Sequence, residues 1–184
     1  MTFRIVGFSG SSSAPSKTQA LVGLAVSRLS QRFGAVAVCR SVVDLQPSLG
    51  AAGSLADLDP PAAGIVQSLV TADALILGVP VYKGSYPGLF KHLFDLIEPE
   101  ALRGKPVLLL ATGGGERHAL VIEHQLRPLM GFFEAATLPT GVYAASAEFR
   151  DGLPSAPALL ARLDRAIEDF APLIAAKARL TRAA

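Results

Sequence analysis

Short apolar segments alternate along the chain with longer segments in which apolar residues recur at helical spacing. The apolar runs predict five buried strands, at residues 3–9, 36–40, 74–79, 106–111 and 135–138. The periodic segments predict helices at residues 18–33, 62–71, 89–97, 118–133 and 156–180. Residues 46–61 have no clean period and are expected to form a loop.

This alternation indicates an α/β fold. Strands that are apolar throughout, separated by helices, form a parallel sheet covered on both faces. Five such strands fit a flavodoxin-like three-layer sandwich with strand order 2-1-3-4-5. The sequence contains no repeat or linker, so we expect a single domain over residues 1–180 and a loose tail at residues 181–184.

The loop after the first strand, residues 9–19, is rich in serine and leads into a helix. Backbone N–H groups, hydroxyls and the helix dipole at such a place favour a phosphate, and Lys17 could add charge. The simpler interpretation is a solvated, serine-rich helix cap. A P-loop is excluded because Ser16 stands where a glycine must precede the lysine, and the G-x-G-x-x-G dinucleotide pattern is also absent.

Two further loops follow predicted strands that would end at the same edge of the sheet. In residues 80–88, PVYKGSYPG, the side chains of Tyr82 and Tyr86 offer flat apolar faces for a planar ring, although a surface turn explains them equally well. In residues 112–118, TGGGERH, three successive glycines allow the backbone to approach a ligand closely. We favour a ligand-binding role for the glycine loop over a flexible connection.

Composition narrows the function classes. Hydrophobic residues make up 51% of the chain and charged residues 17%, a balance that favours burial of some surface in an oligomer. A net charge of +2 without a basic stripe argues against nucleic-acid binding. No apolar run is long enough for a transmembrane helix, and Cys39, the single cysteine, reads as a buried strand thiol suited to a reducing cytoplasm.

Taken together, these segments resemble the NADPH-dependent FMN reductase family, and most closely the reductases that supply reduced flavin to alkanesulfonate and methanesulfonate monooxygenases. The resemblance is carried by GSSSAPSKT, PVYKGSYPGLFKHLFDLI, ATGGGERHAL, HQLRPL and LPTGVYA, and it extends from the first strand to about Phe149. One departure is that the family often has arginine where Ser13 or Lys17 stands here.

The resemblance implies that FMN lies across the three loops and that NADPH stacks on its open face. It implies a phosphate site at Ser9, Ser11, Ser16, Lys17 and Thr18, ring and ribityl contacts at Pro80, Val81, Tyr82 and Lys83, and further ring contacts at Thr112, Gly113, Gly114 and Gly115. It also implies a homotetramer built as a dimer of dimers, and a partner monooxygenase.

Hydride transfer between two cofactors asks the protein mainly to align two rings. We therefore assign no acid–base catalyst. The three histidines have no cysteine or carboxylate cluster at metal-ligand spacing, so no metal site is expected.

Pro128 lies inside the fourth predicted helix and has no N–H for the carbonyl of His124. A wide turn could let the N–H of Leu129 serve that carbonyl. The reductases of sulfonate systems are similar in having a one-residue π insertion at the position of His124, where it is thought to tune flavin retention. An ordinary proline kink is the alternative.

Three other functions are compatible with parts of this pattern. A quinone or azo reductase would have the same loops but retain its FMN. A flavodoxin-type electron carrier is usually strongly acidic, so the charge of +2 argues against it. A flavin-free interaction domain would not bind FMN at all.

Overall fold

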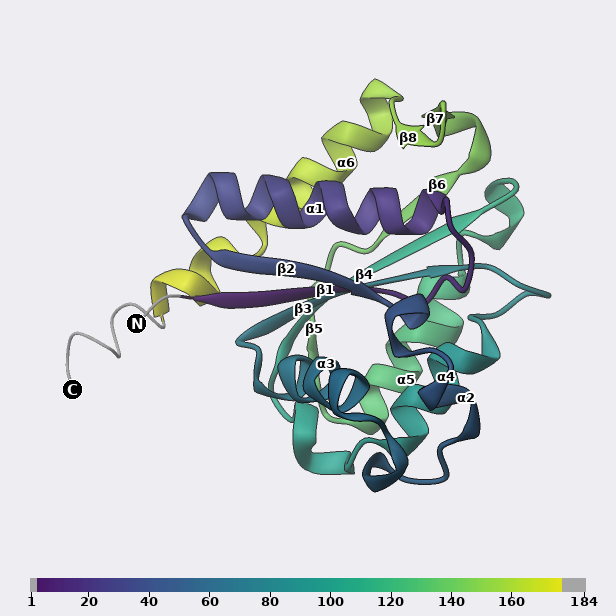
Figure 1. The fold of residues 1–184 in the computed structure, drawn as a ribbon. Helices are drawn as coiled ribbons and strands as arrows, with labels where there is room; N and C mark the ends of the chain where they lie inside the picture. The colour runs from purple at the N-terminus through teal and green to yellow at the C-terminus, as the bar shows by residue number, and fades with distance from the viewer. Residues whose placement is uncertain (1–2, 177–184) are drawn as a thin grey trace.

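The structure is a computed structural model and describes residues 3–176. Its main sheet has the predicted order, β2-β1-β3-β4-β5, and all of its strand pairs are parallel (Figure 1). A sixth segment, β6, pairs with the carboxyl end of β4. The strands of this sheet are β1 (Arg4–Ser9), β2 (Val36–Ser41), β3 (Ala74–Pro80), β4 (Pro106–Gly113), β5 (Ala136–Thr137) and β6 (Val142–Ala145).

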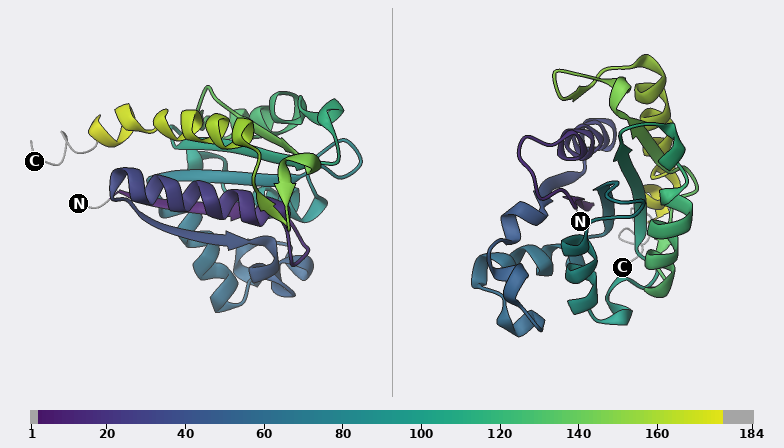
Figure 2. Two further views of the ribbon diagram at one scale, coloured as in Figure 1. Left: turned by 90° about the horizontal axis from the view of Figure 1, so that it is seen from above. Right: turned by 90° about the vertical axis from the view of Figure 1, so that its right-hand side faces the viewer.

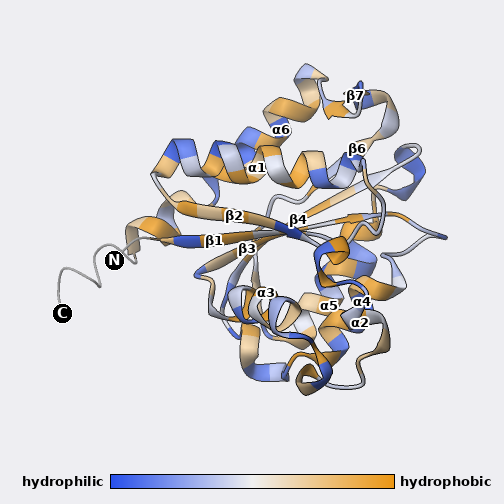
Figure 3. Ribbon diagram, in the orientation of Figure 1, coloured by the Kyte–Doolittle hydropathy of each residue, from blue (hydrophilic) through white to orange (hydrophobic). Residues whose placement is uncertain are grey.

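Helices cover both faces of the sheet, which makes the predicted three layers (Figures 1 and 2). One face carries α1 (Lys17–Phe33) and α6 (Pro157–Glu168), and the other carries α2 (Ser48–Ala51), α3 (Pro60–Thr71), α4 (Gly88–Leu96) and α5 (Arg127–Phe132). The central strands β3 and β4 are buried along almost their whole length, and Figure 3 shows the sheet as largely hydrophobic. The flavodoxin-like fold predicted from the sequence is therefore confirmed.

Helix α1 packs unusually close to the middle of the sheet. A Cβ added to Gly78 on β3 would lie 2.4 Å from Val22 Cγ2, and one added to Gly7 on β1 would lie 2.4 Å from Val26 Cγ2. Glycine is therefore required at both positions because the helix occupies the space of their side chains. This close approach also brings the start of α1 next to the ends of β1 and β4.

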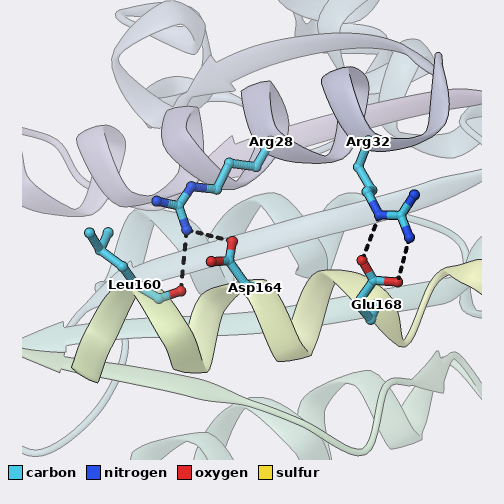
Figure 4. A network of polar contacts seen from close by, with 5 residues as sticks. All are labelled: Arg28, Arg32, Leu160, Asp164 and Glu168. Carbon is cyan, nitrogen blue, oxygen red and sulfur yellow. Dashed lines mark hydrogen bonds and ion pairs between the residues drawn. The ribbon is translucent and has the colours of Figure 1, made fainter. Parts of the chain in front are cut away.

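Polar pairs join α1 to α6 along their exposed sides (Figure 4). The guanidinium of Arg28 donates to the Asp164 carboxylate at 2.5 Å and to the Leu160 carbonyl at 3.2 Å. Arg32 forms a second ion pair with Glu168, at 2.8 Å. Because at least one side chain of each pair is largely exposed, each pair contributes only about 0.2–1 kcal/mol, and the buried faces of the helices stabilise the layer.

The fifth strand differs from the prediction. Residues 135–138 were expected to form one strand, but β5 contains only Ala136–Thr137 and pairs with the start of β4. The segment β6, which the hydrophobic pattern did not predict, lies in line with β5 and pairs with the end of β4. Pro139 and Gly141 lie between the two and account for the interruption, because proline lacks the N–H that a ladder needs.

The edge strand β2 is less buried than its sequence suggests. Val36 is 54% exposed and Val38 is 38% exposed, and Cys39 is only half-buried. That partial burial raises the pKa of the Cys39 thiol, and nearby Asp44 adds to the effect. Cys39 is thus a strand residue as predicted, but it is not a fully buried one.

Other boundaries also shift. Residues 46–61, expected to be loop, contain α2 and a 3₁₀ turn at Leu55–Asp57. The Asp57 carboxylate caps the start of this turn by accepting a hydrogen bond from the N–H of Ser54. Residues 149–154 add a small antiparallel hairpin, β7 (Phe149–Arg150) and β8 (Leu153–Pro154). The long final helix is interrupted after Glu168 and resumes at residues 171–176, and the expected tail at residues 181–184 lies outside the described residues.

Among the described helices, none has the length and apolar character needed to cross a membrane.

Candidate functional site

The loops after β1, β3 and β4 meet at the carboxyl edge of the sheet and enclose a cleft of about 240 Å³. This is where ligands bind in open α/β sheets. All three predicted loops contribute, since the cleft is lined by Ser11, Ser13, Pro15, Ser16, Lys17, Thr18, Pro80, Val81, Tyr82, Thr112, Gly113, Gly114, Ser146 and Phe149. Three larger hollows have other linings, and one of them lies directly behind the glycine loop, so the chemistry of the lining, rather than size, identifies the site.

In the first loop, hydroxyl groups organise the backbone. The Ser9 hydroxyl accepts a hydrogen bond from the N–H of Ser11 at 3.3 Å, and the Ser11 hydroxyl accepts one from the N–H of Ser13 at the same distance. Ser9 is fully buried and does not line the cleft. Its role in the structure is to shape the loop, while Ser11 and Ser13 reach the cleft wall.

The start of α1 lines this cleft through Ser16, Lys17 and Thr18. Ser16 is the N-cap residue, and its hydroxyl accepts a hydrogen bond from the N–H of Gln19 at 3.2 Å. The first turn of the helix contains no acidic residue, so nothing offsets the positive end of the dipole. The Lys17 ammonium lies 5.6 Å from the centre of the Phe149 ring, at the same wall. An anion is therefore the ligand that this end of the cleft favours.

A buried hydroxyl pair joins the first loop to the third. The Oγ1 atoms of Thr18 and Thr112 are 2.6 Å apart, and both residues are at most 6% exposed. Thr18 stands in the first turn of α1 and Thr112 stands near the end of β4. The pair fixes the distance between the start of α1 and the glycine loop.

The second loop forms a tight two-residue turn. Tyr82 and Ser85 exchange two backbone hydrogen bonds of 2.8 and 3.1 Å, with Lys83 at φ 52° and Gly84 at φ 86° between them. Positive φ at both central residues is the geometry of a type I′ turn. The turn leaves Tyr82 45% exposed at the cleft, while the Lys83 side chain does not line it.

Tyr86 takes a different place from the one expected. Its ring packs at 5.8 Å from the Phe90 ring, against the hydrophobic core, and it does not line the cleft. Tyr86 stands just before the N-cap of α4, and its ring packs back onto Phe90 in the first turn of that helix. Tyr82 is therefore the aromatic side chain that the second loop offers to a planar ligand.

The third loop continues directly from β4. The N–H of Val81 donates to the Thr112 carbonyl at 2.8 Å, which joins the second loop to the third. Gly113 and Gly114 line the cleft, whereas Gly115 lies beyond it. Without side chains, Gly113 and Gly114 can present backbone N–H groups at contact distance from a ring.

Four residues that line the cleft were not assigned from the sequence. Ser13 and Pro15 belong to the first loop and could have been included with its other members. Ser146 and Phe149 follow β6, a strand that the hydrophobic pattern did not predict, so their approach to the first loop could not be anticipated.

The predicted helix at residues 118–133 is not continuous. A 3₁₀ turn at Glu116–His118 is followed by a π-helical segment, Ile122–Leu126, and then by α5. The wide turn is closed by the Arg127 N–H, which donates to the Ile122 carbonyl five residues earlier. His124 lies in this segment and Pro128 follows it, so the wide turn stands where the sequence suggests one, although this bond differs from the expected bond between Leu129 and His124.

The π-helical segment contacts the second loop. The hydroxyl of Ser85 donates to Oε1 of Gln125 at 3.1 Å. Arg127 anchors the other side of the segment through the Thr137 hydroxyl at 2.8 Å and the Leu138 carbonyl at 3.0 Å. Arg127 also forms an ion pair with Glu123, whose hydrogen bonds from the guanidinium lower the pKa of the Glu123 carboxyl.

Comparison with known proteins agrees with this arrangement. Residues 3–149 match the family described as NADPH-dependent FMN reductase. The chain is 47% identical over 170 residues to the NADH-dependent FMN reductase SfnF of Pseudomonas fluorescens (strain Pf0-1), which covers 92% of this chain and 91% of that protein. It is 44% identical over 184 residues to the FMN reductase (NADPH) of Pseudomonas aeruginosa, which covers 99% of this chain and 98% of that protein.

A solved structure is similar over the same extent. An oxidoreductase from Corynebacterium diphtheriae matches with a TM-score of 0.80 at 32% sequence identity. The match covers 95% of this chain and 97% of that chain.

Proposed function

The chain belongs to the NADPH-dependent FMN reductase family, and on that premise we propose that it transfers a hydride from NADPH to FMN and releases reduced flavin to a partner monooxygenase of sulfonate desulfonation. The observation that carries the proposal is one cleft that spans the carboxyl ends of β1, β3 and β4, with a helix start at one end and a glycine loop at the other. FMN has a phosphate at one end and a planar ring at the other, in the same order.

The residues of the cleft fit this molecule. We assign the phosphate to the start of α1, where the helix N–H groups, the Ser16 hydroxyl and the Lys17 charge converge. We assign the ring to the space between Tyr82 and the Gly113–Gly114 backbone. The full set that we propose to bind or shape the FMN site is Ser9, Ser11, Ser16, Lys17, Thr18, Pro80, Val81, Tyr82, Lys83, Thr112, Gly113, Gly114 and Gly115.

The protein's share of the chemistry is orientation. Flavin, when bound, accepts a hydride at N5 from a nicotinamide. The glycine loop supplies backbone N–H donors that stabilise negative charge on the ring, and its lack of side chains leaves one ring face open for the nicotinamide. The Thr18–Thr112 pair keeps the phosphate end and the ring end of the cleft in register.

We also propose a homotetramer that acts in the cytoplasm. Leu120, His124, Pro128 and Phe132 stand at four-residue spacing and are all exposed, and Leu120 and Phe132 are 62% and 67% exposed. This exposed stripe, formed by the π-helical segment and its flanks, supports a subunit interface. The lone thiol of Cys39 fits a reducing compartment.

Anaerobic gel filtration after reduction tests the proposed function. The protein is loaded with FMN, reduced with one equivalent of NADPH and separated from small molecules. We expect the flavin in the small-molecule fraction, and a protein fraction that shows no yellow flavin colour after it is reoxidised in air. Reduced flavin that stays with the protein and is reoxidised by an added quinone would instead identify a quinone or azo reductase. NADH in place of NADPH, in a parallel run, establishes the preferred nucleotide.

A further inference from the structure

Tyr143 on β6 contacts the glycine loop from behind the cleft. Its hydroxyl donates to the Gly115 carbonyl at 2.6 Å. The side chain lines a separate hollow of about 560 Å³, together with Ile122 and Arg162, and does not line the cleft. Tyr143 is therefore in contact with the loop but lies on the opposite side from the proposed flavin.

The backbone of Tyr143 is fixed by its own contacts. It lies beside Ala111 in the parallel register of β4 and β6. Its carbonyl accepts a hydrogen bond from the Arg162 guanidinium at 3.1 Å, and Arg162 forms an ion pair with Glu148 at 2.7 Å. The second oxygen of Glu148 accepts the N–H of Ala145, at 3.0 Å. The hydroxyl of Tyr143 thus projects from a rigid base.

The same hydroxyl explains why the loop has glycine at position 113. A Cβ added to Gly113 would lie 2.1 Å from Tyr143 Oη and 3.1 Å from its Cζ. A Cβ added to Gly114 would meet no atom within 4 Å. The hydroxyl therefore occupies the side-chain space of Gly113 while it bonds Gly115, and it contacts the loop at two points.

We infer that Tyr143 is a positioning residue for the flavin, whose hydroxyl sets the Gly113–Gly115 loop at the place where its N–H groups meet the ring. This rests on the proposed function. Three successive glycines lose much conformational entropy when they order around a ligand. A loop that the Tyr143 hydroxyl already orders loses less conformational entropy when flavin binds, so it binds flavin more tightly.

The protonation state of Tyr143 suits this role. Burial, and then the neighbouring Glu148 carboxylate, raise the pKa of the Tyr143 hydroxyl from its ordinary value of 10.0. The hydroxyl therefore stays protonated and able to donate throughout the neutral range, and it loses the donor only as the pH rises above that ordinary value.

Titration of the Tyr143→Phe variant with FMN and with riboflavin is the first test. Loss of one neutral hydrogen bond should raise the Kd by about three- to tenfold. Because the loop contacts the ring, both flavins should weaken by the same factor, and the KM for FMN should rise while kcat is unchanged. A Kd equal to that of the wild type would overturn the inference. So would loss of the cooperative melting transition, which would show that the hydroxyl supports the fold rather than the loop.

A double-mutant cycle provides the second test. Gly113→Ala should weaken FMN binding strongly, because the new methyl group collides with the Tyr143 hydroxyl. In the Tyr143→Phe background the nearest contact becomes Cζ at 3.1 Å, so the double variant should bind FMN more tightly than Gly113→Ala alone. Gly114→Ala is the matched control, and its effect should be the same in both backgrounds.

The outcomes separate the two proposals. If Gly113→Ala weakens FMN binding equally in both backgrounds and the wild-type chain binds FMN, the role of Tyr143 is overturned but the proposed function is not. A wild-type chain that binds neither flavin would overturn the proposed function and this inference with it.

Discussion

At the scale of single residues, the hydroxyls of the first loop differ in what they can do for a ligand. Ser9 and Thr18 are buried and bonded within the protein, so they shape the site from inside. Ser16 lines the cleft at the start of α1, and its hydroxyl proton is free to face a phosphate because the N-cap bond uses only its oxygen.

We expect Ser16→Ala to weaken FMN more than riboflavin, which lacks the phosphate. A hydrogen bond to a charged group is worth about 1.5 kcal/mol or more, roughly tenfold in Kd. Ser27→Ala, an exposed serine of the same helix, should leave both Kd values unchanged. Fluorescence titration of both flavins measures the difference, and an equal loss for FMN and riboflavin would contradict the phosphate assignment.

The sequence pattern predicted which loops line the cleft, but it did not predict where each of their side chains points. Tyr82 and Tyr86 are equivalent in the sequence, yet the type I′ turn exposes Tyr82 at the cleft, whereas Tyr86, just before α4, packs on Phe90 against the core. Phe149 could not be assigned, because its contact with Lys17 depends on a hairpin far away in the chain.

At the scale of elements, the wide turn at Ile122–Leu126 has a local cause and a distant contact. Pro128 has no N–H for the His124 carbonyl, which makes an ordinary helix unfavourable there. Gln125, inside the turn, accepts the hydrogen bond from Ser85 beside the Tyr82 turn. The turn therefore touches the loop that we propose to contact the flavin ring.

Deleting His124 should let Arg127 bond Ile122 in an ordinary helical turn, since the spacing falls from five residues to four. The side chains of the shortened turn would then point in new directions. We expect the variant to retain FMN, to purify yellow and to oxidise NADPH without added FMN. Gln125→Ala, which removes only the bond to Ser85, is the matched control. A colourless deletion variant of normal mass, with unchanged dependence on FMN, would show that the wide turn has no part in flavin retention.

Element boundaries were predictable where a local signal marks them. Gly34, at φ 65°, ends α1 as expected, and α1, α3, α4 and the first four strands of the sheet lie close to their predicted ranges. The division of the fifth strand was not predicted, because the four residues of β6 gain stability from pairing with β4 rather than from their own pattern.

At the scale of the whole molecule, the exposed stripe of Leu120, His124, Pro128 and Phe132 supports assembly. We expect light scattering at micromolar concentration to give a mass well above the 19.1 kDa of one chain. Phe132→Glu should lower that mass, because a charge in an apolar interface is costly. Leu153→Glu, at a side chain equally exposed on β8, is the control and should not lower it. A monomeric wild-type chain would contradict the proposed tetramer.

The fold follows from the hydrophobic pattern, and the site follows from the fold. Five apolar segments and the helices between them set the strand order, which brings the three loops to one edge of the sheet. What the sequence could not provide was the set of contacts made by β6, among them those of Tyr143, because they join segments about 30 residues apart.

Steady-state oxidation of NADPH as a function of free FMN tests most directly whether this cleft reduces FMN as a substrate. For the purified chain we expect almost no oxidation without FMN, and a rate that rises with FMN concentration to a plateau. The Ser16→Ala variant should reach the same plateau at a higher FMN concentration, because Ser16 contributes to binding alone. A rate that is already maximal without added FMN, or no oxidation at any FMN concentration, would contradict the proposal.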